Sequence, residues 1–157
     1  MKPAYQKVLV AVPPPNHELY AKPLDAIRRA AASLSMLPGL HLNFLGVFSV
    51  AEELGSGGLN LMPPEILERE LALHKETHRK SIEEYTKWFA GNSISHSIHV
   101  DNGDPADIVL KYAKEWDTDL ILMGAHHEHG MFDIFTSNVA KSILKHAPCD
   151  VMMIASK

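Results

Sequence analysis

Residues 101–124 read DNGDPADIVLKYAKEWDTDLILMG and contain a turn, a helix and a strand in that order. Asp104 suits the N-cap of the helix, and Pro105 suits its first position. The apolar side of this helix consists of Ile108, Leu110, Tyr112 and Ala113. Residues 119–124, DLILMG, are apolar almost throughout, which is typical of a strand buried on both faces. This stretch therefore predicts one helix–strand unit of a parallel sheet.

The same alternation extends toward both ends of the chain. Residues 7–12, KVLVAV, form a second continuous apolar run, which the prolines at 13–15 end. Apolar periodicity with Pro and Gly stops predicts a helix over 23–37, a strand within 40–50, a loop over 52–64, a long helix over 64–90, an edge strand over 95–100, a helix over 138–146 and a strand over 151–154. We therefore predict one α/β domain over 1–157, with an open five-stranded parallel sheet and helices on both faces in the Rossmann-like manner.

Composition narrows the class of protein. The chain has 157 residues, of which 46% are hydrophobic and 22% charged, values typical of a globular domain. A net charge of -4 without a Lys/Arg block argues against nucleic acid as a partner. No apolar run approaches the ~20 residues that cross a bilayer. One cysteine, Cys149, fits a reducing compartment, so we expect a cytoplasmic protein without a membrane partner.

A ligand site is expected at one edge of the sheet. Open α/β sheets bind ligands at the carboxyl ends of their strands, near the topological switch point. Three predicted loops end there, over 13–16, 103–106 and 124–138. A helix beginning near Asn138 would direct its free amide N–H groups toward that crevice, which is a general geometry for anion binding.

Three motifs in this order resemble the universal stress protein family. They are GDPA at 103–106, DLILMG at 119–124 and VAKSILKHAPCDV at 139–151, and the opening KVLVAV also matches. The resemblance covers nearly the whole chain. It implies the strand order 3-2-1-4-5, a homodimer joined through the last strand and, in many members, bound ATP.

The resemblance also implies a nucleotide motif, from which this chain departs. The family pattern is Gly, two residues, Gly, nine residues, Gly and Ser/Thr, beginning at the end of the fourth strand. Gly124 matches the first glycine, whereas His127 and Ser137 stand at the next two and Asn138 replaces the Ser/Thr. Gly130 matches a further glycine of many members. His126 occupies a position that is often His or Arg.

The adenosine side of the implied pocket is altered as well. ATP-binding members usually carry Asp directly after the first strand, where this chain has Pro13. Val47 matches the valine whose backbone usually meets adenine, and Gly103 opens the turn after the third strand. Proline offers neither a carboxylate nor an N–H, and the His127 side chain would crowd the approach of phosphate to the backbone. The sequence therefore identifies no cofactor with certainty. We expect that ATP or another adenine nucleotide, if it binds, binds more weakly than in the ATP-binding members.

Three of the ten histidines, His126, His127 and His129, cluster in the predicted ligand loop. Three interpretations are open. The histidines belong to a polar surface loop without a ligand, they contact an anionic ligand that binds more tightly when they are protonated, or they bind a transition metal. Contiguous loop residues do not preset a tetrahedral site, so metal ranks last among these alternatives.

A second histidine pair lies on the predicted long helix. His74 and His78 are one turn apart in HKETH, which is not the zinc motif HExxH because Glu76 is misplaced. Their spacing would suit two ligands on one helix face. Both also fall on the helix's apolar stripe, so we expect partly buried, hydrogen-bonded rings and no metal site.

Three functions follow from these patterns. No Ser/His/Asp arrangement or carboxylate pair stands at a defined spacing, which favours a protein that is not an enzyme. The leading hypothesis is a non-enzymatic regulatory homodimer with a degenerate nucleotide pocket and an unidentified protein partner. One alternative is an ATP-binding switch with weak hydrolysis, in which Gly124, His126, Gly130 and Asn138 contact phosphate. The other is a metal-responsive protein that uses the loop histidines.

Overall fold

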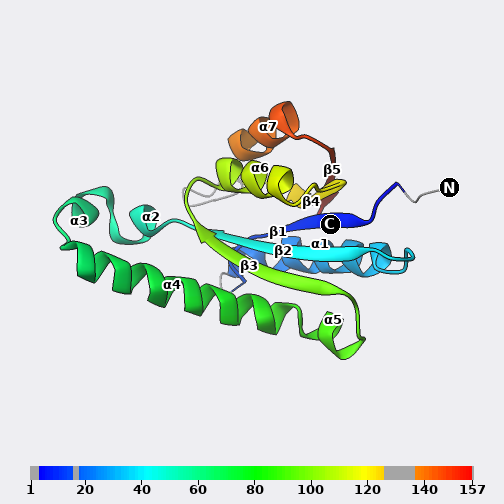
Figure 1. Ribbon diagram of the computed structural model, residues 1–157, viewed down its shortest axis with the longest axis horizontal. Coiled ribbons are helices and arrows are strands. Elements are labelled where there is room, and N and C mark those ends of the chain that lie inside the picture. Colours follow the sequence, from blue (N-terminus) through cyan, green and yellow to red (C-terminus); the bar gives the residue numbers. More distant parts are fainter. Residues whose placement is uncertain (1–3, 16–17, 126–136, 157) are drawn as a thin grey trace.

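Five parallel strands form one sheet in the order β3-β2-β1-β4-β5 (Figure 1). A computed structural model describes residues 4–15, 18–125 and 137–156. The strands are β1 (Lys7–Val12), β2 (His41–Phe48), β3 (His96–Asn102), β4 (Leu120–Ala125) and β5 (Asp150–Ala155). The predicted α/β class and the strand order implied by the family resemblance are both confirmed.

Helices cover both faces of the sheet. They are α1 (Ala21–Leu34), α2 (Val50–Leu54), α3 (Ser56–Asn60), α4 (Pro64–Tyr85), α5 (Lys87–Gly91), α6 (Pro105–Glu115) and α7 (Ser137–His146), and a 3-10 turn, Glu18–Tyr20, precedes α1. In Figure 1, α6 and α7 lie above the sheet and α4 lies below it. Helix α1 shares the lower face with α4, because both pack against the same hydrophobic cluster.

Two predictions about the middle of the chain are wrong. Residues 52–64, expected to be a loop, contain the short helices α2 and α3. Each spans only five residues, too few to show the periodicity of a helix in the sequence. The long helix expected to reach residue 90 ends at Tyr85, and a separate short helix, α5, spans Lys87–Gly91.

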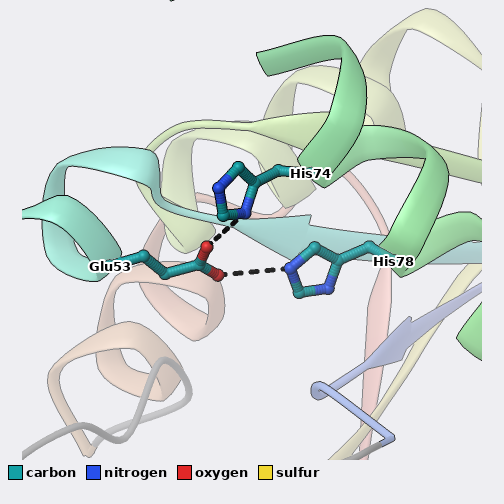
Figure 2. Close-up of side chains that lie close together, drawn as sticks. All are labelled: Glu53, His74 and His78. Atoms are coloured by element: carbon teal, nitrogen blue, oxygen red, sulfur yellow. Dashed lines mark hydrogen bonds and ion pairs between the residues drawn. The ribbon is translucent and has the colours of Figure 1, made fainter. Parts of the chain in front are cut away.

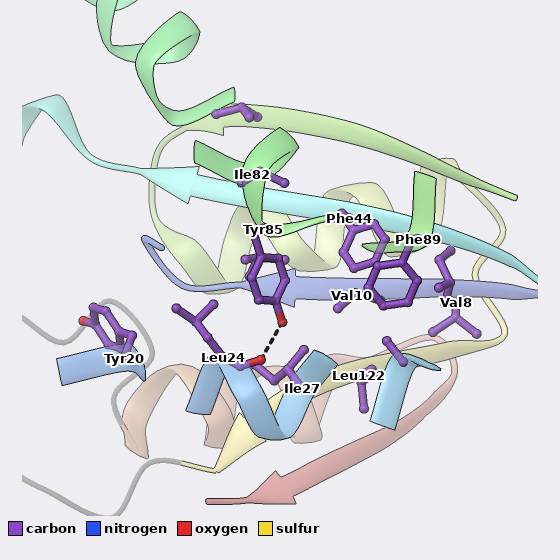
Figure 3. Close-up of a cluster of buried hydrophobic side chains, with 14 of the residues drawn as sticks. Val8, Val10, Tyr20, Leu24, Ile27, Phe44, Ile82, Tyr85, Phe89 and Leu122 are labelled. Carbon is purple, nitrogen blue, oxygen red and sulfur yellow. Dashed lines mark hydrogen bonds between the residues drawn. The ribbon is translucent and has the colours of Figure 1, made fainter. Parts of the chain in front are cut away.

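The alternating side chains of β1 divide the core into two clusters. Val8, Val10 and Val12 face α1 and α4, whereas Leu9 and Ala11 face α6 and α7. This is why β1 is apolar at every position after the exposed Lys7. The aromatic rings of the lower cluster gather around Phe44 (Figure 3). Tyr85 also donates a hydrogen bond from its hydroxyl to the Leu24 carbonyl at 2.6 Å, which links α4 to α1.

The last strand occupies a sheet edge, as the family order implies. It pairs on one side with β4, where Leu122 lies opposite Met152 and Met123 opposite Met153. Residues 151–154 are only partly buried, although all four are apolar. An apolar edge strand with open backbone groups is a surface that pairs readily with another strand.

Candidate functional site

The carboxyl ends of the central strands carry the predicted adenosine side of the pocket. Pro13 directly follows β1 and is buried, and Val47 in β2 is 2% exposed. The register pairs Val12 with Gly46, so Pro13 and Val47 are the next residues on neighbouring strands. Pro13 therefore occupies the position at which the family resemblance implies an Asp that contacts the adenosine part of the nucleotide.

The turn after β3 is bonded to the end of β2. Gly103 has φ +153, and its N–H donates to the Phe48 carbonyl at 3.0 Å. This backbone conformation favours glycine, and a Cβ at the position would lie 3.1 Å from the Ile108 side chain, which would have to shift. The Asp104 carboxylate accepts from the Asp107 N–H at 3.1 Å, which confirms the predicted N-cap of α6.

Gly124 serves helix packing. It lies within β4, where a Cβ would stand 3.3 Å from Ile27 Cδ1 and 3.6 Å from Pro23 Cβ. The absence of a side chain thus lets α1 approach the sheet. A phosphate motif is therefore not the only reason for glycine here, and the sequence pattern by itself did not reveal this second role.

Helix α7 carries the last predicted anion ligands. It begins at Ser137, and Asn138, its second residue, is exposed. His126, His127, His129 and Gly130 lie outside the described residues. The structure thus places Pro13, Val47, Gly103 and Gly124 at or near the carboxyl ends of four adjacent strands and Asn138 in the first turn of α7.

A second polar cluster lies where α2 meets α4 (Figure 2). The Glu53 carboxylate contacts His74 Nδ1 at 2.5 Å through Oε2 and His78 Nε2 at 3.2 Å through Oε1. Both imidazoles are partly buried and contact this carboxylate, so the expected partial burial and hydrogen bonding of the two rings are confirmed. Glu53 was not singled out from the sequence, because it comes from the segment that was expected to be a loop.

A third cluster lies between β3 and α6. The Tyr112 hydroxyl donates to Asp101 Oδ2 at 2.6 Å and lies 2.7 Å from His99 Nε2. Since that hydroxyl has one proton, the geometry favours His99 as the Nε2–H donor. The neighbouring cavity, about 220 Å³, is lined by Asn43, Phe44, Ser97, Ile98, His99 and Trp116. No sequence signal joined these residues, which come from two strands, a helix and the residue that follows it.

Burial and hydrogen bonding shift the pKa values of this third cluster. Burial, with the bond to Asp101 and its charge, raises the pKa of Tyr112 to about 12. Burial lowers the pKa of His99 against the opposing attraction of Asp101. Burial acts to raise the pKa of Asp101, but hydrogen bonds from Tyr112 and the Asn102 N–H outweigh it, so the pKa is lowered. At neutral pH the cluster is a carboxylate, a phenol and an uncharged imidazole.

None of the helices in residues 4–15, 18–125 and 137–156 has both the length and the apolar character needed to cross a membrane.

Comparison with known proteins identifies the family. The model of the universal stress protein family matches residues 4–155. A universal stress protein of Bacillus subtilis is 24% identical over 151 residues, which cover 96% of this chain and 99% of the relative. Two other matches are partial: the aligned regions are 58% of a Synechocystis universal stress protein, at 21% identity, and 43% of universal stress protein A homolog 2 of Coxiella burnetii, at 34% identity.

Solved structures have the same fold. A universal stress protein in complex with cAMP is 16% identical with a TM-score of 0.59, covering 99% of this chain and 100% of the other. An Arabidopsis thaliana universal stress protein family protein with AMP bound is 21% identical with a TM-score of 0.58, covering 97% and 92% of the two chains. Because the family model spans nearly all of the sequence, the chain belongs to the universal stress protein family.

Proposed function

We propose that this protein is a non-enzymatic regulatory member of its family, with a nucleotide pocket that binds ATP weakly. The observation that carries the proposal is the buried Pro13 beside Val47, at the position where ATP-binding members supply a carboxylate. The loss of this ligand on the adenosine side is matched by His127 on the phosphate side of the sequence motif.

Some affinity for smaller adenine nucleotides is part of the proposal. Relatives of the same fold have been solved with cAMP and with AMP. A monophosphate needs fewer backbone contacts than a triphosphate, so the changes at His127 and Ser137 penalise it less. Val47 still offers its backbone at the end of β2, and α7 still begins after β4 with Asn138 in its first turn.

The test is calorimetry of the purified chain with Mg-ATP, AMP and cAMP, together with the variants Pro13→Asp and His127→Gly. We expect weak or no binding of ATP by the unaltered chain. Restoring both residues should tighten ATP binding by at least about tenfold, equivalent to one charge-assisted hydrogen bond. Submicromolar ATP affinity in the unaltered chain would contradict the proposal. Release of ADP would then favour the alternative of an ATP-hydrolysing switch.

We also propose a cytoplasmic homodimer that pairs through β5 and acts on an unidentified protein partner. The apolar, partly exposed residues of β5 at a sheet edge support this assembly, because two-fold pairing would satisfy their open backbone groups. The absence of a basic block and the single cysteine support the location and argue against nucleic acid as a partner.

A further inference from the structure

We propose that Glu53, His74 and His78 bind one divalent transition-metal ion, and that zinc is the metal best matched to this donor set. Two imidazoles and one carboxylate are ligands that zinc accepts, and a set of three leaves a position open for water or another ligand. The site is separate from the loop histidines and from the proposed nucleotide pocket.

The three donor groups already converge on one point (Figure 2). His74 and His78 are four residues apart on α4, so their rings project from the same helix face. One ligand atom from each of the three residues lies within 4.8 Å of the others. Ligands bound to zinc at 2.0–2.2 Å in tetrahedral geometry are about 3.4 Å apart. Small side-chain rotations therefore suffice to close the cluster around an ion.

The ring of Phe48, here called the aromatic wall, packs against both imidazoles and restrains their planes. The Phe48 ring stacks on His78 with centroids 4.8 Å apart and planes at 10°, and on His74 at 6.3 Å and 17°. Phe48 is the last residue of β2 and is 1% exposed, so the wall is part of the core. Rings held in this way lose little further rotational freedom on binding a metal, which favours affinity.

A second carboxylate stands behind one of the ligands. Glu70 Oε2 lies 3.7 Å from His74 Nε2, on the ring nitrogen that does not face Glu53. Metal-ligating histidines usually direct their other N–H to such a group, which sets the tautomer and makes the ligand more basic. At 3.7 Å Glu70 is beyond hydrogen-bond distance, so a rotation of its side chain must complete this contact. With both imidazoles neutral, the carboxylates of Glu53 and Glu70 together balance the two charges of the ion.

Metal binding would fasten α2 to α4 at the edge of the sheet where the strands end. Val50, the first residue of α2, donates its N–H to Asn102 Oδ1 at 3.0 Å, beside the Gly103 turn. An ion on Glu53 would thus stabilise the segment that follows β2 and leads away from Val47.

The test is calorimetric titration of the full chain with ZnCl2, alongside the visible spectrum of the Co²⁺ complex. We expect one ion per chain and the intense bands of four-coordinate Co²⁺. Glu53→Gln and His78→Ala should each weaken zinc binding by more than about tenfold. Loss of a residue that only orients a metal ligand typically weakens binding by about 10- to 100-fold, and these two residues are proposed to be ligands themselves. Glu70→Gln, which alters a positioning residue, should produce a smaller loss.

Two controls keep the result attributable to this cluster. The triple variant His126→Asn, His127→Asn and His129→Asn, and the variant His146→Asn, should leave zinc affinity unchanged. Glu53→Gln alters an exposed side chain, so circular dichroism should show an intact fold. Zinc binding that survives Glu53→Gln and His78→Ala, disappears in the triple loop variant, or is absent from the unaltered chain overturns the proposal.

Discussion

Removing the Tyr112 hydroxyl tests whether the cluster between β3 and α6 stabilises the fold. Tyr112→Phe keeps the ring, which packs 4.7 Å from Trp116 between centroids, and deletes only the oxygen that bridges Asp101 and His99. A hydrogen bond to a charged group contributes about 1.5–3 kcal/mol. The Asp101 side chain is 28% exposed, so water replaces part of the lost bond, and we expect a loss of about 1–2 kcal/mol in the free energy of unfolding.

The assay is urea unfolding at pH 7, with the midpoint and the slope fitted separately. Tyr5→Phe is the matched control, because Tyr5 also donates to an aspartate, Asp150 Oδ2 at 2.9 Å, but at an exposed site. The control should change stability far less than Tyr112→Phe. Equal losses for the two variants, or no loss for Tyr112→Phe at an unchanged slope, would refute the reasoning.

The pH dependence supplies an independent readout for the same variant. The pKa values of Asp101 and His99 are both lowered in the folded state, from 3.8 and 6.5. The unfolded chain therefore binds more protons than the folded one, and stability falls as the pH drops below 6.5 for His99 and below 3.8 for Asp101. Because a protonated Asp101 no longer gains from the phenol, the destabilisation caused by Tyr112→Phe should shrink at the acid end of the titration.

Three further predictions concern the core, a strand glycine and the assembly. Phe89→Ala should lower the free energy of unfolding by about 3–5 kcal/mol in a urea titration, because the Phe89 ring is fully buried with its centroid 5.0 Å from that of Phe44. Trp88 is half-exposed, so a loss no larger than that caused by Trp88→Ala would contradict this prediction. Gly124→Ala should lower the midpoint of thermal unfolding of the ligand-free protein, because a Cβ at this position would lie 3.3 Å from Ile27 Cδ1. An unchanged midpoint would contradict the packing role and leave phosphate binding as the reason for glycine. Met153→Asp places a charge on the edge strand β5, so analytical ultracentrifugation should show monomers, or the protein should be insoluble. If the unaltered chain is a monomer at micromolar concentration, pairing through β5 is disproved.

The five strands and the helices α1, α6 and α7 could be predicted because each depends on local sequence. The runs KVLVAV and DLILMG are apolar at every strand position that the two helical layers cover, and Asp104 and Pro105 mark the start of α6. The strand order could be predicted only through the family resemblance. The alternation of strands and helices predicts that the strands are parallel, but it does not indicate which strands are neighbours.

The polar clusters depended on tertiary structure. Glu53 meets His74 and His78 only because α4 runs back past α2 after the chain has left β2, and α2 is too short to show a helical period (Figure 1). Gly124 looked like a motif residue, whereas its contact with Ile27 depends on how α1 crosses the sheet. The sequence by itself determined the class of fold and the edge of the sheet where ligands are expected, since both follow from short-range patterns. Packing between segments distant in the chain decided which side chains meet, because such contacts depend on helix placement that no local pattern specifies.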